Sequence, residues 1–127
     1  MAIARKALVG LAWFYVLGVA VQFFLAGLGL PQLGGEGMDA HEALGYSALH
    51  LTPILFIVLA VIAKAGRNVI ALTVVFAVVS FLQPIWVVEF EGEFLASFHI
   101  LGALVIFVLA HTLARQATHL LRSESAS

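Results

Sequence analysis

The sequence predicts an all-α fold, an integral membrane four-helix bundle whose successive helices run up, down, up and down. Of its 127 residues, 63% are hydrophobic and only 10% are charged, against roughly 25% charged residues in soluble domains. Four apolar segments reach the length of about 20 residues that a helix needs to cross a hydrocarbon core. All six Lys and Arg side chains would also lie at one end of such a bundle. A water-soluble fold this short has no means of covering so much apolar surface.

The apolar segments and the breaks between them set the expected bounds. We expect transmembrane spans at about residues 7–30, 40–63, 69–88 and 95–114, in one domain covering residues 1–127 with a cytoplasmic tail at 115–127. A turn-forming stretch with one Pro and three Gly (31–37), a short polar turn (64–68) and an acidic turn (89–93) separate the spans. Connections this short make sequential helices antiparallel neighbours.

The charges predict the orientation. The cations flank the spans on one side, at Arg5, Lys6, Lys64, Arg67, Arg115 and Arg122. The other side holds six carboxylates and no cation, at Glu36, Asp39, Glu42, Glu89, Glu91 and Glu93. Because Lys and Arg stay on the cytoplasmic side, we expect both termini inside. The scattered cations form no nucleic-acid-binding stripe, and the absence of cysteine excludes disulfides and thiolate metal sites.

Prolines, aromatic residues and glycines predict local features of the spans. Pro53 and Pro84 each lack a backbone donor, which frees the carbonyl groups of Leu49 and Ser80. Four aromatic residues are expected to anchor the helices at the membrane interfaces: Trp13, Tyr15, Tyr46 and Trp86. Five glycines are candidates for close approach between helices: Gly10, Gly18, Gly27, Gly45 and Gly102.

The two halves of the chain share an approximate pattern. Gln22 in span one is followed by the segment HEALG (41–45) at the start of span two. Gln83 in span three is followed by HILG (99–102) at the start of span four. The His-to-Gly spacing differs by one residue, so the pattern indicates either a duplicated helix pair or chance similarity between Leu-rich helices.

Histidines inside the spans are the candidate functional residues, because ionisable groups in hydrocarbon are costly. From the ~1.5 Å rise per residue, His41 and His99 lie at similar depth on helices that run in the same direction. Two such histidines suit the axial positions of one haem b, with Gln22 or Gln83 as a hydrogen-bond acceptor that fixes the tautomer. The sequence therefore predicts an electron carrier with His41 and His99 as ligands.

A deeper pair, His50 and His111, is the second choice. Their depths differ by about 9 Å, which helix tilt would have to absorb. The cations on the inner side would favour this pair, because haem propionates prefer Lys or Arg partners. The angular spacing of the histidines on each helix (about 180° and about 120°) argues against two stacked haems.

Two other interpretations stay open. His41 and His99 could bind a metal ion together with the outer carboxylates, since imidazole and carboxylate suit zinc, copper or iron. Alternatively, the His and Gln side chains could only hydrogen-bond between helices in a non-enzymatic accessory protein. No hydrolase or transferase motif is visible, and enzymatic activity is left open. Beyond the lipid bilayer, the expected partners are a second copy of the chain or a redox protein.

The motifs carry a resemblance that covers nearly the whole chain. Gln22 and the residues after it, the DAHEALG segment (39–45), Gln83 and the HILGA segment (99–103) resemble a family of small bacterial four-span membrane proteins of unknown function. That resemblance implies fold and topology but no activity. A looser resemblance is to four-helix b-type membrane cytochromes, which place paired histidines on alternate helices, although the His spacing here departs from the two-haem pattern.

Overall fold

The computed structural model describes residues 1–125, and these residues form helices and turns without a strand. The α-helices are α1 (Ala2–Leu28), α2 (Met38–Leu44), α3 (Thr52–Ile62), α4 (Arg67–Val88) and α5 (Phe98–Ser125). Two 3-10 turns, η1 (Pro31–Leu33) and η3 (Phe94–Ser97), and one π-helical turn, η2 (Gly45–Leu49), lie between them. Four helical segments are long and apolar enough to cross a membrane, namely 2–28, 38–62, 67–88 and 94–123. The predicted all-helical fold with four candidate spans is confirmed.

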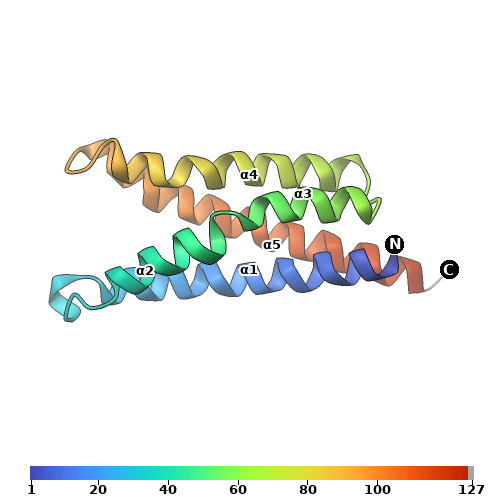
Figure 1. The fold of residues 1–127 in the computed structure, drawn as a ribbon, viewed down its shortest axis with the longest axis horizontal. Helices are drawn as coiled ribbons and strands as arrows, with labels where there is room; N and C mark the ends of the chain where they lie inside the picture. Colours follow the sequence, from blue (N-terminus) through green and yellow to red (C-terminus); the bar gives the residue numbers. More distant parts are fainter. Residues whose placement is uncertain (126–127) are drawn as a thin grey trace.

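The helices form a bundle in which each span runs opposite to the one before it (Figure 1). α1 packs against α3 and α5, and α4 packs against the same two helices, so α1 and α4 are diagonal to each other. The termini and the α3–α4 turn share one end of the bundle (Figure 1), which we call the cationic end because it carries the six Lys and Arg residues. The opposite end, with the α1–α2 and α4–α5 loops and the start of α2, carries six carboxylates and is called the acidic end.

Helix α5 extends beyond the predicted span. Residues 115–125, expected to be a tail, continue the helix to Ser125. Ala117 is buried, and the Thr118 hydroxyl accepts a hydrogen bond from Trp13 Nε1 at 3.2 Å. The sequence of these turns predicts a polar tail, but packing against α1 stabilises them as helix.

An aromatic cluster fills the centre of the bundle. Tyr15, Phe56 and Phe76 meet edge to face, with ring centroids 5.0 to 5.6 Å apart, a favourable arrangement for aromatic pairs. Tyr15 is only 3% exposed, so its predicted role as an interface anchor is wrong. Side chains two residues apart on a helix point about 200° apart. Trp13, which is 44% exposed, therefore faces outward while Tyr15 faces the bundle interior.

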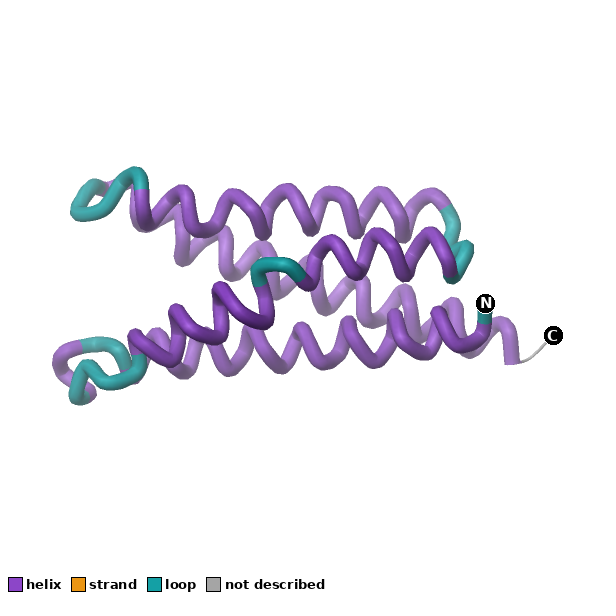
Figure 2. The backbone as a smooth tube through the Cα atoms, in the orientation of Figure 1, coloured by secondary structure: helices purple, strands orange, loops and turns teal. Residues whose placement is uncertain are grey.

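Span two is broken near its middle, where the path of the chain shifts between α2 and α3 (Figure 2). The His50 N–H donates to the Gly45 carbonyl at 2.9 Å, an i→i−5 bond that closes the π turn. Pro53 leaves the Leu49 carbonyl without its helical donor, and the Tyr15 hydroxyl donates to that carbonyl at 3.4 Å. The predicted release of the Leu49 carbonyl is confirmed, whereas α4 continues through Pro84 as one helix.

Replacement of Tyr15 by phenylalanine is expected to destabilise the bundle by about 0.6 to 1.7 kcal/mol, the value of a hydrogen bond inside a membrane protein. In a Pro53→Ala background the same replacement should cost less, because residue 53 then donates to the Leu49 carbonyl itself. Reversible unfolding in mixed micelles measures both effects, with the exposed Tyr46→Phe variant as control. Equal costs in the two backgrounds would contradict this assignment of the Tyr15 hydroxyl.

Candidate histidine-pair site

His41 is held by the neighbouring helix of its own half. It lies on α2, and its Nδ1 is 3.1 Å from the main-chain carbonyl oxygen of Gln22 on α1. A carbonyl oxygen only accepts hydrogen bonds, so Nδ1 must carry the proton and donate it. In the neutral imidazole, the other ring nitrogen, Nε2, then carries the available lone pair. The half-buried imidazole is thus fixed in the tautomer that metal ligation requires.

His99 repeats this arrangement in the second half of the chain. It lies on α5, and its Nδ1 is 3.0 Å from the main-chain carbonyl oxygen of Gln83 on α4 and 3.1 Å from the side-chain amide nitrogen of the same residue. The two imidazole rings approach each other, with centroids 6.2 Å apart and planes inclined by 68°. Because α2 and α5 do not pack directly against each other, the rings meet across the diagonal of the bundle. The sequence correctly predicted that these residues share one depth.

The glutamine side chains occupy space that two glycines leave open. The Gln22 amide nitrogen lies 2.9 Å from the point where Gly45 would carry a Cβ, and a Cβ on Gly102 would collide with the Gln83 amide. Hydrogen bonding orients the Gln83 amide so that its nitrogen donates to the His99 carbonyl at 2.9 Å and its oxygen accepts from the Ala103 N–H at 3.2 Å. Both halves therefore share one construction, in which a Gln packs on a Gly one helical turn after the His.

Each histidine contacts the main-chain carbonyl oxygen of a glutamine, an atom that the sequence did not predict. We expected the acceptor for each histidine without specifying its atom, and it is the main-chain carbonyl in both halves. The Gln22 Oε1 atom is buried and has no hydrogen-bond partner within the part of the chain that the structure describes. An unpaired buried acceptor beside the His pair indicates a position where a donor from a ligand or a water would be stabilised.

Alanine at Gly102 or Gly45 is expected to push the glutamine away and lower the free energy of unfolding by about 1 to 3 kcal/mol, as overpacking does. The larger loss should occur at Gly102, where the collision is more severe. Gly10→Ala is the matched control, because a Cβ at this position of α1 would have no atom within 4 Å. Thermal unfolding in detergent measures the three variants. A Gly102→Ala protein as stable as Gly10→Ala would refute the proposed packing.

The rings of His50 and His111, the alternative pair, contact two different helices. The His50 ring contacts Phe81 of α4, with centroids 5.1 Å apart, while His111 contacts Trp13 of α1 at 5.8 Å. Within residues 1–125 no ring contact joins these two histidines. The five glycine candidates also differ in their surroundings. A Cβ added at Gly18 would lie 2.9 Å from Leu49 Cδ2, whereas a Cβ at Gly10 or Gly27 would have no atom within 4 Å.

The spacing of His41 and His99 discriminates between ligand geometries. With metal–nitrogen bonds of about 2.0 to 2.1 Å, two imidazoles on opposite sides of a metal have centroids about 6.4 Å apart, and two in a tetrahedral site about 5.2 Å. The observed 6.2 Å fits the opposed arrangement. Among the described residues no group of three His, Cys, Asp or Glu lies close enough to hold a metal ion, so the acidic-end carboxylates do not complete such a site. If the two Nε2 atoms face each other, the pair would suit a metal whose remaining ligands come from a planar macrocycle.

The structure is a helical bundle with four segments long and apolar enough to cross a membrane, and its two helix pairs each place a histidine Nδ1 beside a Gln main-chain carbonyl. The chain matches no protein-family model, no curated protein and no solved structure. The resemblance to small bacterial four-span proteins therefore stays a prediction.

Proposed function

We propose that this protein is a small b-type haem electron carrier of the bacterial cytoplasmic membrane, with both termini in the cytoplasm. His41 and His99 would hold the haem iron. The observation that supports the proposal is the matched pair of imidazoles, each with Nδ1 bonded to a carbonyl and the two centroids 6.2 Å apart. Four-helix bundles commonly build cofactor sites from side chains on facing helices.

The chain's own groups would set the properties of such a site. Bound haem would supply reversible one-electron chemistry. Hydrogen bonds from Nδ1 to the carbonyls of Gln22 and Gln83 would orient both rings and increase their basicity, which stabilises the oxidised iron. The carboxylates of the acidic end and the lack of any Lys or Arg there act in the same direction. We therefore expect a low reduction potential.

An absorbance spectrum tests the proposal. Protein purified from haem-replete cells, or the apoprotein titrated with haem, is expected to show a Soret band and, when reduced, the sharp α band of six-coordinate low-spin iron. Binding should saturate at one haem per chain. The same titration of an unrelated four-span protein in the same detergent controls for haem that partitions into micelles. A spectrum identical to that control would overturn the proposal.

A structural role is the second candidate, because the His contacts link helices without any ligand. His41 ties α2 to α1, and His99 ties α5 to α4. Each bond is worth about 0.6 kcal/mol on average in a membrane protein. If this role is the whole function, added haem leaves the unfolding temperature unchanged. If the haem proposal is right, haem raises it, since a ligand that binds only the native state stabilises that state.

A further inference from the structure

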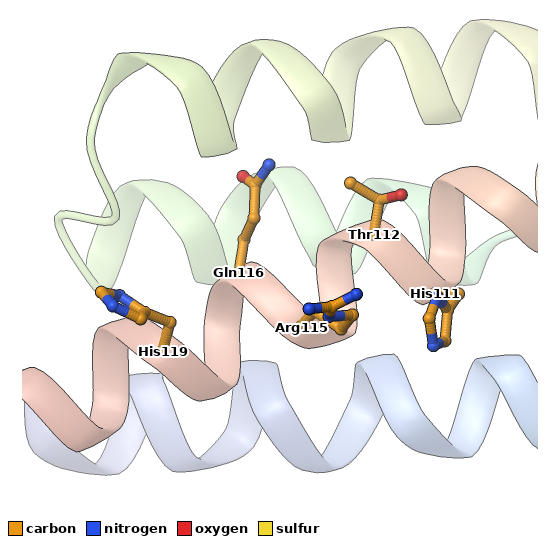
Figure 3. A pocket seen from close by; sticks show the side chains of 5 residues that line it. All are labelled: His111, Thr112, Arg115, Gln116 and His119. Carbon is orange, nitrogen blue, oxygen red and sulfur yellow. The ribbon is translucent and has the colours of Figure 1, made fainter.

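A second polar site lies on α5 near the cationic end, far from the histidine pair. Five side chains of this helix line a hollow of about 330 Å³: His111, Thr112, Arg115, Gln116 and His119. Figure 3 shows that Thr112 and Gln116 point to the opposite side of α5 from His111. The lining contains one permanent cation and two histidines but no carboxylate. Arg115 is exposed and makes no hydrogen bond or ion pair with any group that the structure describes.

The hollow lies at the level expected for lipid headgroups. Arg115 follows His99 by 16 residues, which corresponds to about 24 Å along the helix axis. Since His99 lies near one end of the span, Arg115 lies near the other boundary of a hydrocarbon core about 30 Å thick. His111 and His119 flank this level, one helical turn before and one after.

An apolar row continues from the hollow toward the membrane centre. Val108, Leu104 and Leu101 precede Arg115 by 7, 11 and 14 residues, the spacing of one helix face. All three side chains are more than half exposed. A cationic, donor-rich hollow at headgroup level that leads into an exposed apolar row complements a molecule with an anionic head and hydrocarbon chains.

From this arrangement we infer that α5 binds an anionic phospholipid of the leaflet at the cationic end. Arg115 pairs with the phosphate, while Gln116 and His119 donate hydrogen bonds to the headgroup oxygens. The acyl chains lie along Val108, Leu104 and Leu101. Basic hollows at a membrane surface bind anionic headgroups in this manner. The site is independent of the proposed haem function, because it uses neither His41 nor His99.

Trp13 provides a reporter for this lipid. Its ring contacts His111 at a centroid distance of 5.8 Å, so a lipid in the hollow brings its chains near the indole. The chain has two Trp residues, and Trp86→Phe leaves Trp13 as the only one. This variant is placed in phosphatidylcholine vesicles with a small fraction of lipid brominated on the acyl chains, either phosphatidylglycerol or phosphatidylcholine. Bromine quenches the fluorescence of a nearby indole.

Brominated phosphatidylglycerol is expected to quench Trp13 at about a fivefold lower mole fraction than brominated phosphatidylcholine, the preference that one cation near the headgroup provides. Arg115→Gln should remove this preference. Arg67→Gln is the matched control, because Arg67 is an exposed cation of the same end but lies outside the hollow, and it should keep the preference.

Two outcomes would overturn the inference. Equal quenching by the two lipids, or loss of the preference in both Arg variants, would mean that only general surface charge attracts the lipid. Loss of the preference on addition of millimolar inorganic phosphate would mean that the hollow binds a soluble anion instead. Circular dichroism of each variant in the same vesicles verifies that the helices are intact.

Discussion

Alanine at either His41 or His99 is expected to abolish the low-spin haem spectrum and to reduce haem affinity by more than 100-fold. Loss of a group that only orients a metal ligand costs roughly 10- to 100-fold, and loss of the ligand itself should cost more. His50→Ala and His111→Ala are the matched controls, because their rings contact Phe81 and Trp13 and not the other histidines. These two variants should keep the spectrum.

Haem titrations of the four variants, each compared with its own unfolding temperature, measure this prediction. A variant that has lost both haem and stability is not informative alone, so His41→Ala and His99→Ala are also titrated with free imidazole present. Imidazole should restore the spectrum if the missing side chain is a ligand. If His50→Ala or His111→Ala loses haem while His41→Ala and His99→Ala keep it, the ligands are the deeper pair and the proposed site is wrong.

The second large effect concerns topology. The chain contains no cysteine, so a single introduced cysteine is an unambiguous reporter. Glu36→Cys and Glu91→Cys, in the two loops of the acidic end, should react fully with a membrane-impermeant maleimide in intact bacterial cells. Asn68→Cys, at the start of α4 at the cationic end, should react only after lysis. Reaction of Asn68→Cys in intact cells, with protection of the other two, would invert the proposed orientation.

The fold was largely predictable because the bilayer imposes a strong constraint on composition and length. Four apolar segments and six segregated cations indicated four antiparallel helices, and four candidate spans are present. The approach of His41 to His99 was predictable because the helical rise gives the depth of each residue, and the two match in depth within about one turn on helices that run in the same direction.

Rotation about the helix axis was not predictable in the same way. Tyr15 was placed at an interface, yet it is buried beside Phe56, because hydropathy gives depth and carries no information on which face is inward when every face is apolar. The contacts of His50 depend on the π turn and on the break before Pro53, a local change of helical phase that the residues alone do not specify. Such a turn changes the direction of every preceding side chain relative to α3.

Only the atomic contacts show in what way the two halves of the chain resemble each other. The sequence pattern of Gln, His and Gly left duplication and chance as alternatives, and its spacing differs by one residue between halves. The structure places the same bond, from Nδ1 to a Gln carbonyl, in both halves, and packs each Gln on the following Gly.

Electron paramagnetic resonance of the oxidised, haem-loaded protein tests the central claim most directly, because the signal depends on both the identity and the orientation of the axial ligands. The two imidazole planes are inclined by 68°. The account predicts a low-spin signal of large anisotropy, with one resolved low-field feature, as steeply inclined imidazoles produce. A high-spin signal, or a rhombic low-spin signal typical of coplanar rings, would contradict the assignment of His41 and His99 as the ligand pair.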